Sequence, residues 1–460
     1  MISLHANLEI AKRGMQTSQL AMNVLSSNIA NVNTPGYSRR RPAIREGRGI
    51  DTGVGYLGSG SEVANIRRVR DSILDGLYRR HQSDVGRWSG VEDYLSKVET
   101  LMNEPGLGGL SDVMGEFWTS WEDLSNEPES AAVRSQVRLR GEALCDSFQR
   151  LDSHLRGLQT SLGDDIETLV GQVNEMSARL AEVNTMIRES ELAGHEASGL
   201  RDERDLLLDQ LSEVANLQVE ESPDGMAIIM LGSQVLVQGG TARRIECPTG
   251  TPSRSGAYTF VWEGTDREVS VESGLLKGYL AARNEHIASY ISDLDALAQG
   301  FVTQINAAHS SGYGLDGSTG TDFFDPGKVT AADISIDSDI LGNLDLIAAS
   351  AGGLVGDGQN ALAIANLKSV STMSGSSITF DAFYNTLVGR VGLECKEAVS
   401  MREAEELLVL DVENQRAAIS GVSLDEEMAH LISYQHAYEA MVQVAGTIDE
   451  MLADLIAVLG

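Results

Sequence analysis

The sequence is poor in cysteine, proline and aromatic residues. Its 460 residues include 3 cysteines and 8 prolines, and aromatic side chains make up 5%. Cys145, Cys247 and Cys395 are far apart, odd in number and outside any CxxC pair, which argues against a disulfide framework and a thiolate zinc site. The scarcity of proline excludes collagen-like and proline-rich disordered chains. We expect the three cysteines to be small, buried side chains.

Long apolar runs are absent as well. No stretch approaches the roughly 18 uninterrupted apolar residues of a membrane span. The opening residues, MISLHANLEIAKRGMQ, lack the apolar core and small-residue cleavage site of a secretory signal. We therefore expect no membrane span and no cleavable signal peptide. The chain is too long for one core, since single cores stop growing near roughly 250–300 residues, and two or three domains are expected.

Positive charge is scarce: 35 Lys and Arg face 67 Asp and Glu, for a net charge of -32. Because such a surface repels nucleic acid and anionic lipid headgroups, we expect neither nucleic acid nor a membrane among the partners. The exception is a basic cluster near the N-terminus, consisting of Arg39, Arg40, Arg41, Arg45, Arg48, Arg67, Arg68 and Arg70. This cluster is either a solvated linker or a surface that meets acidic neighbouring subunits.

Apolar residues recur at heptad spacing over the first 30 residues. The seam positions are Leu4, Leu8, Ala11, Met15, Ser18, Met22, Leu25 and Ile29. They predict an amphipathic helix, whose uncharged, amide-rich outer face can pack against other proteins without burying charge. The helix is expected to end within residues 28–37, because Asn tolerates the left-handed conformation and Pro-Gly suits a type II turn.

A second heptad pattern runs along the C-terminal segment. Its positions are Leu424, Met428, Leu431, Gln435, Tyr438, Val442, Ala445, Asp449, Leu452, Ile456 and Leu459. Gln435 and Asp449 interrupt the apolar seam. They either fix the register of a coiled coil or mark where a straight helix drifts from a strict 3.5-residue repeat.

Heptad helices at both ends predict that the termini pair with each other and that the rest is inserted between them. A two-helix pair leaves much of each apolar stripe uncovered, so the ends are expected to be poorly ordered alone. The predicted fold is mainly α with inserted β regions. It has a terminal coiled-coil domain (1–50 and 418–460), a helical-bundle middle domain (51–215, 272–312 and 355–417) and a small β-rich outer region (216–271, with 313–354 as a second candidate).

No catalytic, metal or cofactor site is predicted. His195-Glu196 lacks the second histidine of an HExxH motif. The acidic cluster Asp202, Glu203, Asp205 and Asp209 alternates with Arg and Leu, which favours a solvated helix face over paired catalytic carboxylates. The Asp316 to Asp322 loop resembles half of a calcium loop, but Thr321 stands where Gly is needed and Gly327 where a bidentate Glu is needed. Phe117, Trp118 and Trp121 are expected in the core.

Two terminal strings carry a family resemblance. SSNIANVNTPGYSRR, from Ser26 to Arg40, resembles the N-terminal signature of flagellar axial proteins of the rod, hook and hook-associated class. Its signature residues are Asn28, Asn31, Asn33, Thr34, Pro35, Gly36 and Tyr37. SGVSLDEEMAHLISYQHAYEAMVQV, from Ser420, resembles the matching C-terminal signature. The long helical stretch that follows the first signature favours the hook-associated branch over rod and hook proteins.

The resemblance implies a structural protein rather than an enzyme. Such a protein is exported unfolded through the flagellar channel and assembles outside the cell, at the distal end of the hook, where it joins hook to filament. The implied partners are copies of itself, the hook protein, a second hook-associated junction protein and an export chaperone at the C-terminal helix. Another rod or hook subunit, a free extracellular coiled-coil adhesion module and an extracellular enzyme stay as alternatives.

The apolar seam residues of both terminal helices are expected to pack against partner helices in the assembly. They are Leu4, Leu8, Met15, Met22, Leu25, Ile29, Leu424, Met428, Leu431, Tyr438, Val442, Leu452, Ile456 and Leu459.

Overall fold

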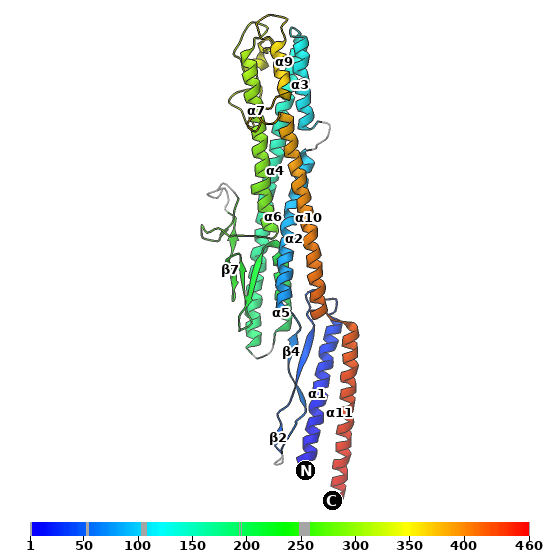
Figure 1. Cartoon of the computed structure of the whole chain (residues 1–460). Coiled ribbons are helices and arrows are strands. Elements are labelled where there is room, and N and C mark those ends of the chain that lie inside the picture. The colour runs from blue at the N-terminus through cyan, green and yellow to red at the C-terminus, as the bar shows by residue number, and fades with distance from the viewer. Residues whose placement is uncertain are drawn as a thin grey trace.

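The structure is a computed structural model that describes residues 2–51, 55–102, 108–192, 194, 196–247 and 258–459. His195, rejected above as part of an HExxH motif, lies outside these residues. The described chain forms an elongated rod, with both termini at one end (Figure 1). The chain therefore runs out along the rod and returns, as the paired terminal heptads predict.

A terminal domain occupies the end of the rod that holds both termini. Helices α1 (Ile2–Ala30) and α11 (Leu424–Leu459) lie side by side there (Figure 1). A long hairpin, β1 (Arg40–Glu46) with β4 (Ser61–Arg68), packs along α1 and is extended by β2 (Ile50–Asp51) and β3 (Tyr56–Leu57). The boundary predicted at residue 50 cuts through this hairpin. Because β1 and β4 pair in one antiparallel ladder from Arg40 with Arg68 to Glu46 with Ser61, the unit continues to Arg68.

A bundle of long helices forms the body. Its members are α2 (Ser72–Met102), α3 (Leu110–Asn126), α4 (Ala131–Glu191), α5 (Ser198–Val214), α6 (Leu275–Ala281), a π-helix (Ala282–Ile287), α7 (Ala288–Ser311) and α10 (Phe380–Ser420). Apolar residues recur at heptad spacing from Leu162 to Ile187 of α4, and these positions are buried apart from the half-buried Met176. This apolar stripe explains why one helix of 61 residues persists without a break.

The far end of the rod holds an aromatic core. Phe117, Trp118 and Trp121 of α3 are at most 2% exposed. Trp118 stacks on Phe301 of α7 with ring centroids 5.3 Å apart, and Phe301 lies 4.3 Å from Phe380 of α10. The core role predicted for the α3 aromatics is confirmed.

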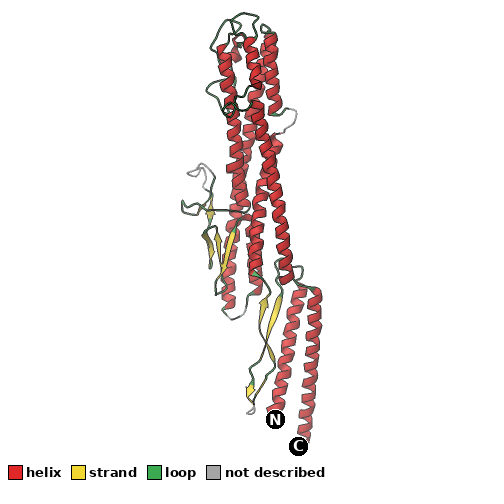
Figure 2. Ribbon diagram, in the orientation of Figure 1, coloured by secondary structure: helices red, strands yellow, loops and turns green. Residues whose placement is uncertain are grey.

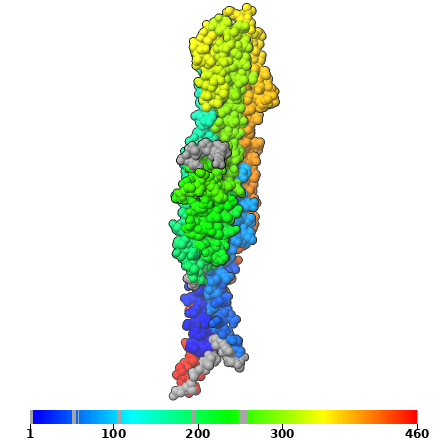
Figure 3. Space-filling view, turned by 90° about the vertical axis from the view of Figure 1, so that its left-hand side faces the viewer, coloured from blue at the N-terminus to red at the C-terminus, as the bar shows by residue number. Residues whose placement is uncertain are grey.

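A small β region projects from one side of the body (Figure 2). Strands β5 (Leu217–Glu221), β6 (Ala227–Leu231), β7 (Gln234–Gln238) and β8 (Thr241–Ala242) form an antiparallel sheet in chain order, beside the pair β9 (Ile245–Glu246) and β10 (Val261–Trp262). Asn184 of α4 fixes the sheet by exchanging two hydrogen bonds with the backbone of Ala227, at 2.8 and 3.0 Å. Figure 3 shows this region covering one side of the rod at mid-length.

The second candidate β region, 313–354, is not a sheet. It consists of turns, isolated bridges, α8 (Ser338–Gly342) and a 3-10 turn (Leu344–Leu346), and α9 (Gln359–Asn366) and a further 3-10 turn (Leu367–Ser369) follow. The prediction was wrong because the alternating residues of this stretch bury Ile334, Ile336 and Ile340 against helices rather than against a strand. Alternating apolar residues in a short segment indicate that every second side chain is buried, but they do not show that the segment pairs with another strand.

Candidate assembly site

Helices α1 and α11 pair antiparallel in a constant register. A Cβ added to Gly14 would lie 3.0 Å from Cγ of Met441, and Asn28 Nδ2 donates to Glu427 Oε2 at 2.8 Å. The two contacts are fourteen residues apart on each helix, so the register does not slip between them. A spacing of two heptads on both helices is that of a coiled coil.

Mostly small residues on α1 face mostly large residues on α11. The buried α1 positions that share the heptad of Gly14 and Asn28 are Ala11, Ser18, Ala21 and Leu25. The α11 positions that share the heptad of Glu427 and Met441 are Leu431, Tyr434, Tyr438, Ala445, Ile448 and Leu452, all buried or half-buried. Short side chains on one helix let the two backbones approach and give the tyrosine rings room to pack.

The structure divides the predicted seam residues between two faces. Leu25 is buried, and the half-buried ones are Leu4, Leu8, Met15, Met22, Ile29, Leu431, Tyr438 and Leu452. In contrast, the exposed fractions of Leu424, Met428, Val442 and Ile456 are 48%, 48%, 45% and 70%. The side chain of Leu459 is not among those that the structure describes.

These four exposed residues do not pack against α1, so their place in a seam toward partner helices of the assembly stays a prediction. Tyr434, Met441 and Ile448 fill the positions that the prediction gave to Gln435, Val442 and Asp449. Gln435 and Asp449 are exposed, so they neither fix the register nor mark a drift of the seam.

Helix α11 exposes large apolar residues on both sides of the face that packs against α1. Its large exposed residues are Leu424, Met428, Ile432, Val442, Val444, Met451, Leu455, Ile456 and Val458. Single exposed apolar side chains are ordinary, but nine large ones on one helix mark an interaction surface. We call this series the outer stripe.

Asn28, the first signature residue, is the centre of a buried knot. Its side-chain nitrogen donates to Arg40 O at 2.9 Å and to Glu427 Oε2 at 2.8 Å. Its side-chain oxygen accepts from Tyr37 Oη at 2.8 Å and from Arg40 N at 3.0 Å. Both donors and both acceptor positions of the amide are therefore used. The knot ties α1, the signature loop, β1 and α11 to one another.

Arg39 extends this knot toward α10. Its side chain is 6% exposed, and it pairs with Glu427 at 2.6 Å and with Glu426 at 2.9 Å. Its backbone N–H donates to Ser420 O, at the end of α10, at 3.0 Å. Arg39 therefore holds the point where the body ends and α11 begins.

The other signature residues shape the loop itself. Asn31 Nδ2 donates to Ser27 O at 2.9 Å, and Thr34 Oγ1 donates to Asn31 Oδ1 at 3.2 Å. Gly36 has a φ of +76°, and a Cβ there would lie 3.2 Å from Leu206 of α5. Asn33 and Pro35 are exposed. The signature is thus a connector that seats the terminal domain against α5.

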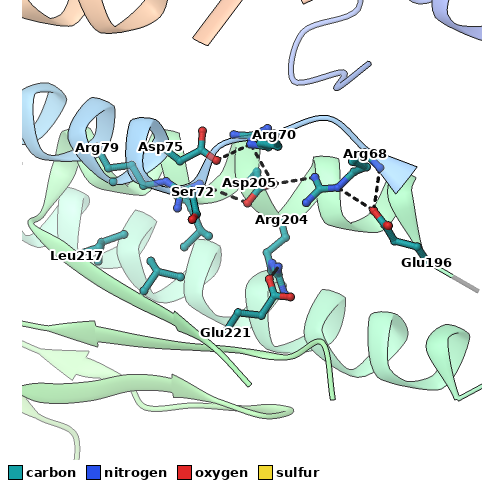
Figure 4. A pocket seen from close by; sticks show the side chains of 13 residues that line it. Arg68, Arg70, Ser72, Asp75, Arg79, Glu196, Arg204, Asp205, Leu217 and Glu221 are labelled. Atoms are coloured by element: carbon teal, nitrogen blue, oxygen red, sulfur yellow. Dashed lines mark hydrogen bonds and ion pairs between the residues drawn. The ribbon is translucent and has the colours of Figure 1, made fainter. Parts of the chain in front are cut away.

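A buried network of arginines and aspartates joins the hairpin to the body (Figure 4). Arg68 NH1 lies 3.0 Å from Asp202 and 2.8 Å from Asp205. The remaining close pairs are Arg40 with Asp202, Arg70 with Asp75, Arg79 with Asp205 and Asp209, and Arg416 with Asp75 and Asp209. We call this set the charged hub. It connects the hairpin with α2, α5 and α10.

Asp205 of the charged hub pairs with three arginines, Arg68, Arg70 and Arg79. Burial alone would raise its pKa, but Arg70, Arg68 and Arg79 together outweigh burial and hold the pKa below the ordinary aspartate value. The hub borders a cleft of about 480 Å³ lined by Arg68, Arg204, Asp205, Glu221 and their neighbours. Its arginines and acids alternate, so the cleft carries no surplus of one sign.

The charged hub corrects two interpretations of the sequence. Asp202 and Asp205 are 8% and 7% exposed, so the acidic cluster of α5 is not a solvated face. Arg39, Arg40, Arg68 and Arg70 bind acids of the same chain and are neither a free linker nor available to neighbours. The sequence contained one signal for this pairing: the arginine cluster near the N-terminus and the acidic cluster of α5 carry opposite charges that can neutralise each other.

The other residues considered in the sequence have structural contacts. Asp316 Oδ1 accepts from Ser318 N at 2.9 Å and from Ser318 Oγ at 2.6 Å, which closes its own turn. Cys145 and Cys395 are buried, Cys247 is half-buried, and all three are free. Within the described residues, no group of His, Cys, Asp or Glu is placed to hold a metal ion, and no helix is long and apolar enough to cross a bilayer.

Three family models match the chain. The flagellar hook-associated protein FlgK helical domain covers residues 95–324. A C-terminal domain of the flagellar basal body rod FlgEFG proteins covers 414–458, and a flagella basal body rod protein domain covers 8–37. The two rod-type matches fall on α11 and α1, the helices of the terminal pair.

Similar proteins cover the whole chain. Flagellar hook-associated protein 1 of Bacillus subtilis is 30% identical, over 100% of this chain and 99% of the relative. The protein of the same name from Escherichia coli is 24% identical over 97% and 98% of the two chains. The solved flagellar hook junction protein FlgK from Burkholderia pseudomallei shares the fold, with a TM-score of 0.68 and 15% identity over 75% of this chain and 100% of its own. The chain therefore belongs to the flagellar hook-associated protein 1 family.

Proposed function

We propose that this chain is a structural subunit of the bacterial flagellum that assembles at the distal end of the hook and joins the hook to the filament. The single observation that carries the proposal is the outer stripe on α11, at the terminal end of a chain that aligns with 99% of its Bacillus subtilis relative. The stripe leaves a second apolar face on a helix whose first face is already packed against α1. A helix with two apolar faces requires neighbours, which an axial assembly supplies.

The proposed partners are copies of the same chain, the hook protein below, a second hook-associated junction protein above and, before assembly, an export chaperone on α11. A chaperone inside the cell and neighbouring subunits in the junction would cover the same outer stripe. Each would remove this apolar surface from water, which is favourable. Export to the outside of the cell belongs to this proposal.

A gene deletion tests the proposal. Cells without the protein are expected to carry hooks without filaments in electron micrographs and to release filament subunits into the medium. Supplying the intact gene should restore filaments. Mutant cells that keep normal filaments would contradict the proposal. A loss of the hooks themselves would instead favour a role as a rod or hook subunit.

A further inference from the structure

Two arginines stand directly opposite each other on the outward face of the hairpin. Arg41 of β1 and Arg67 of β4 are Cα partners in the ladder, and both are exposed. Their neighbours Arg40 and Arg68 bind Asp202 on the other face. Since successive side chains alternate between the faces of a strand, Arg41 and Arg67 share the face turned away from the charged hub.

The two arginines of this pair repel each other in the free chain. Like charges placed directly opposite each other weaken a β-ladder. Among the residues that the structure describes, neither guanidinium has an ion-pair partner, whereas Arg45 on the same hairpin pairs with Glu62. An external carboxylate would remove the repulsion between Arg41 and Arg67.

The same terminal domain exposes the complementary charge on its other edge. Helix α11 has seven acidic residues and no Lys or Arg. Glu426 and Glu427 bind Arg39. The exposed acids of α11 that lack an ion pair within the described chain are Asp425, Asp449, Glu450 and Asp454. In Figure 1, α1 stands between the hairpin and this helix.

We propose that the Arg41 and Arg67 pair of one copy docks on the acidic outer surface of α11 of a second copy. The inference rests on the self-assembly proposed above and names the contact that guides it. Copies placed side by side put the basic edge of one terminal domain against the acidic edge of the next. Because the two edges are different surfaces, the contact is head-to-tail, the type that builds rings and helical arrays. Charge complementarity then fixes register and excludes inverted neighbours.

Charge reversal and rescue test the contact in a flagellated host that lacks its own junction protein. The reversal variant is Arg41→Glu with Arg67→Glu. The rescue partners are Asp425→Arg, or Asp449→Arg with Glu450→Arg, each added to the reversal variant. The control is Arg244→Glu with Arg267→Glu, the same charge change at exposed arginines of the β region. The readout is the ratio of protein bound to isolated hooks to protein secreted into the medium.

We expect the reversal to lower that ratio at least about tenfold, since it replaces attraction by repulsion at every copy-to-copy contact. One of the two rescue sets should restore most of the loss, and the control should match the parent chain. The purified reversal variant should melt at the parent temperature, because both side chains are exposed and neither has an ion-pair partner among the described residues.

Each other outcome counts against the contact. A reversal variant that is retained normally, or one that neither rescue set restores, would overturn it. Early melting of the purified variant would show that the pair serves the fold instead. If the parent chain itself fails to stay on hooks, the proposed function fails rather than this inference.

Discussion

Asn28 shows at the scale of one residue why an amide is needed in the signature. Both of its N–H groups donate and its oxygen accepts twice, with Glu427 as one acceptor. Asn28→Asp removes both donors and sets a second carboxylate against Glu427. We expect the terminal domain to lose about 3 kcal/mol or more, the range for leaving buried polar and charged groups unpaired. Hydrogen exchange of α1 and α11 would measure the loss.

Asn33→Asp is the matched control for this prediction. It makes the same chemical change in the same loop, at an exposed residue. Its effect should stay within about 0.5 kcal/mol, as for ordinary surface substitutions. Equal protection of α1 and α11 in the two variants would show that the Asn28 knot does not hold the domain together.

His309 gives a pH-dependent prediction. It is fully buried, Nδ1 lies 2.7 Å from Thr321 O, and Nε2 accepts from Ala348 N at 2.9 Å, so the ring is neutral with its proton on Nδ1. Burial lowers the pKa of His309 from 6.5 to about 4. The unfolded chain therefore binds the proton more tightly, and the stability from this residue is complete above pH 6.5 and declines as the pH falls toward 4.

The His309→Gln variant isolates that contribution. It should be less stable than the parent at pH 7, and the difference should shrink by about 3 kcal/mol on going to pH 4, as the parent pays the cost of protonating a buried imidazole. Urea unfolding at several pH values measures this difference. A gap that stays constant with pH would contradict the neutral, buried state.

At the scale of a helix, α11 presents two apolar faces with different roles. Leu431 belongs to the face against α1, and Met428 belongs to the outer stripe. Leu431→Asp should remove hydrogen-exchange protection from α1 and α11 in the monomer, because a buried carboxylate without a partner costs several kcal/mol. The helices of the body should keep their protection. An unchanged exchange pattern would show that the terminal pair is open in solution.

Met428→Asp is the companion variant. Its side chain is 48% exposed, so the monomer should exchange and melt like the parent. In cells, the variant should be secreted yet fail to support filaments, because its charge then lies in the covered outer stripe. Measuring the secreted protein separates a failure of assembly from a block in export. Normal filaments with this variant would exclude the outer stripe near Met428 from the junction.

The helices were predictable from the sequence, but the phase of their packing was not. Heptad spacing places Leu431 and Tyr438 on one face whichever neighbouring set completes it, and both Val442 and Met441 are apolar candidates. The choice is made by Gly14, whose missing side chain leaves space for Met441. A preference set by the partner helix cannot be read from one helix alone.

At the scale of the whole molecule, the charged hub couples the terminal domain to the rod. Asp205→Asn leaves Arg68, Arg70 and Arg79 around an uncharged amide, and we expect a loss of about 3–5 kcal/mol, the usual result of removing one partner from a buried ion pair. Glu203→Gln, on the same helix but at an exposed pair with Arg179, should stay within about 0.5 kcal/mol. Thermal unfolding of both variants tests the difference.

The stability that Asp205 contributes falls as the pH falls, as it does for His309, but the cause differs. Neighbouring arginines lower the pKa of Asp205, whereas burial lowers the pKa of His309. The pKa of Asp205 is held below its ordinary value of 3.8, so its contribution is present above that value and is lost as the pH falls further. The hub was not predicted, because Asp205 and Arg68 are far apart in the sequence and each cluster alone resembles a solvated surface. Only the return of the hairpin to α5 brings them together.

A cryo-electron microscopy reconstruction of the hook and filament junction tests the central claim most directly. We expect this chain to form a layer between hook and filament. Its helices α1 and α11 should pack against neighbouring copies, which cover the outer stripe from Leu424 to Val458. A junction in which the outer stripe faces open solvent, or one that holds a different protein at this level, would contradict the account.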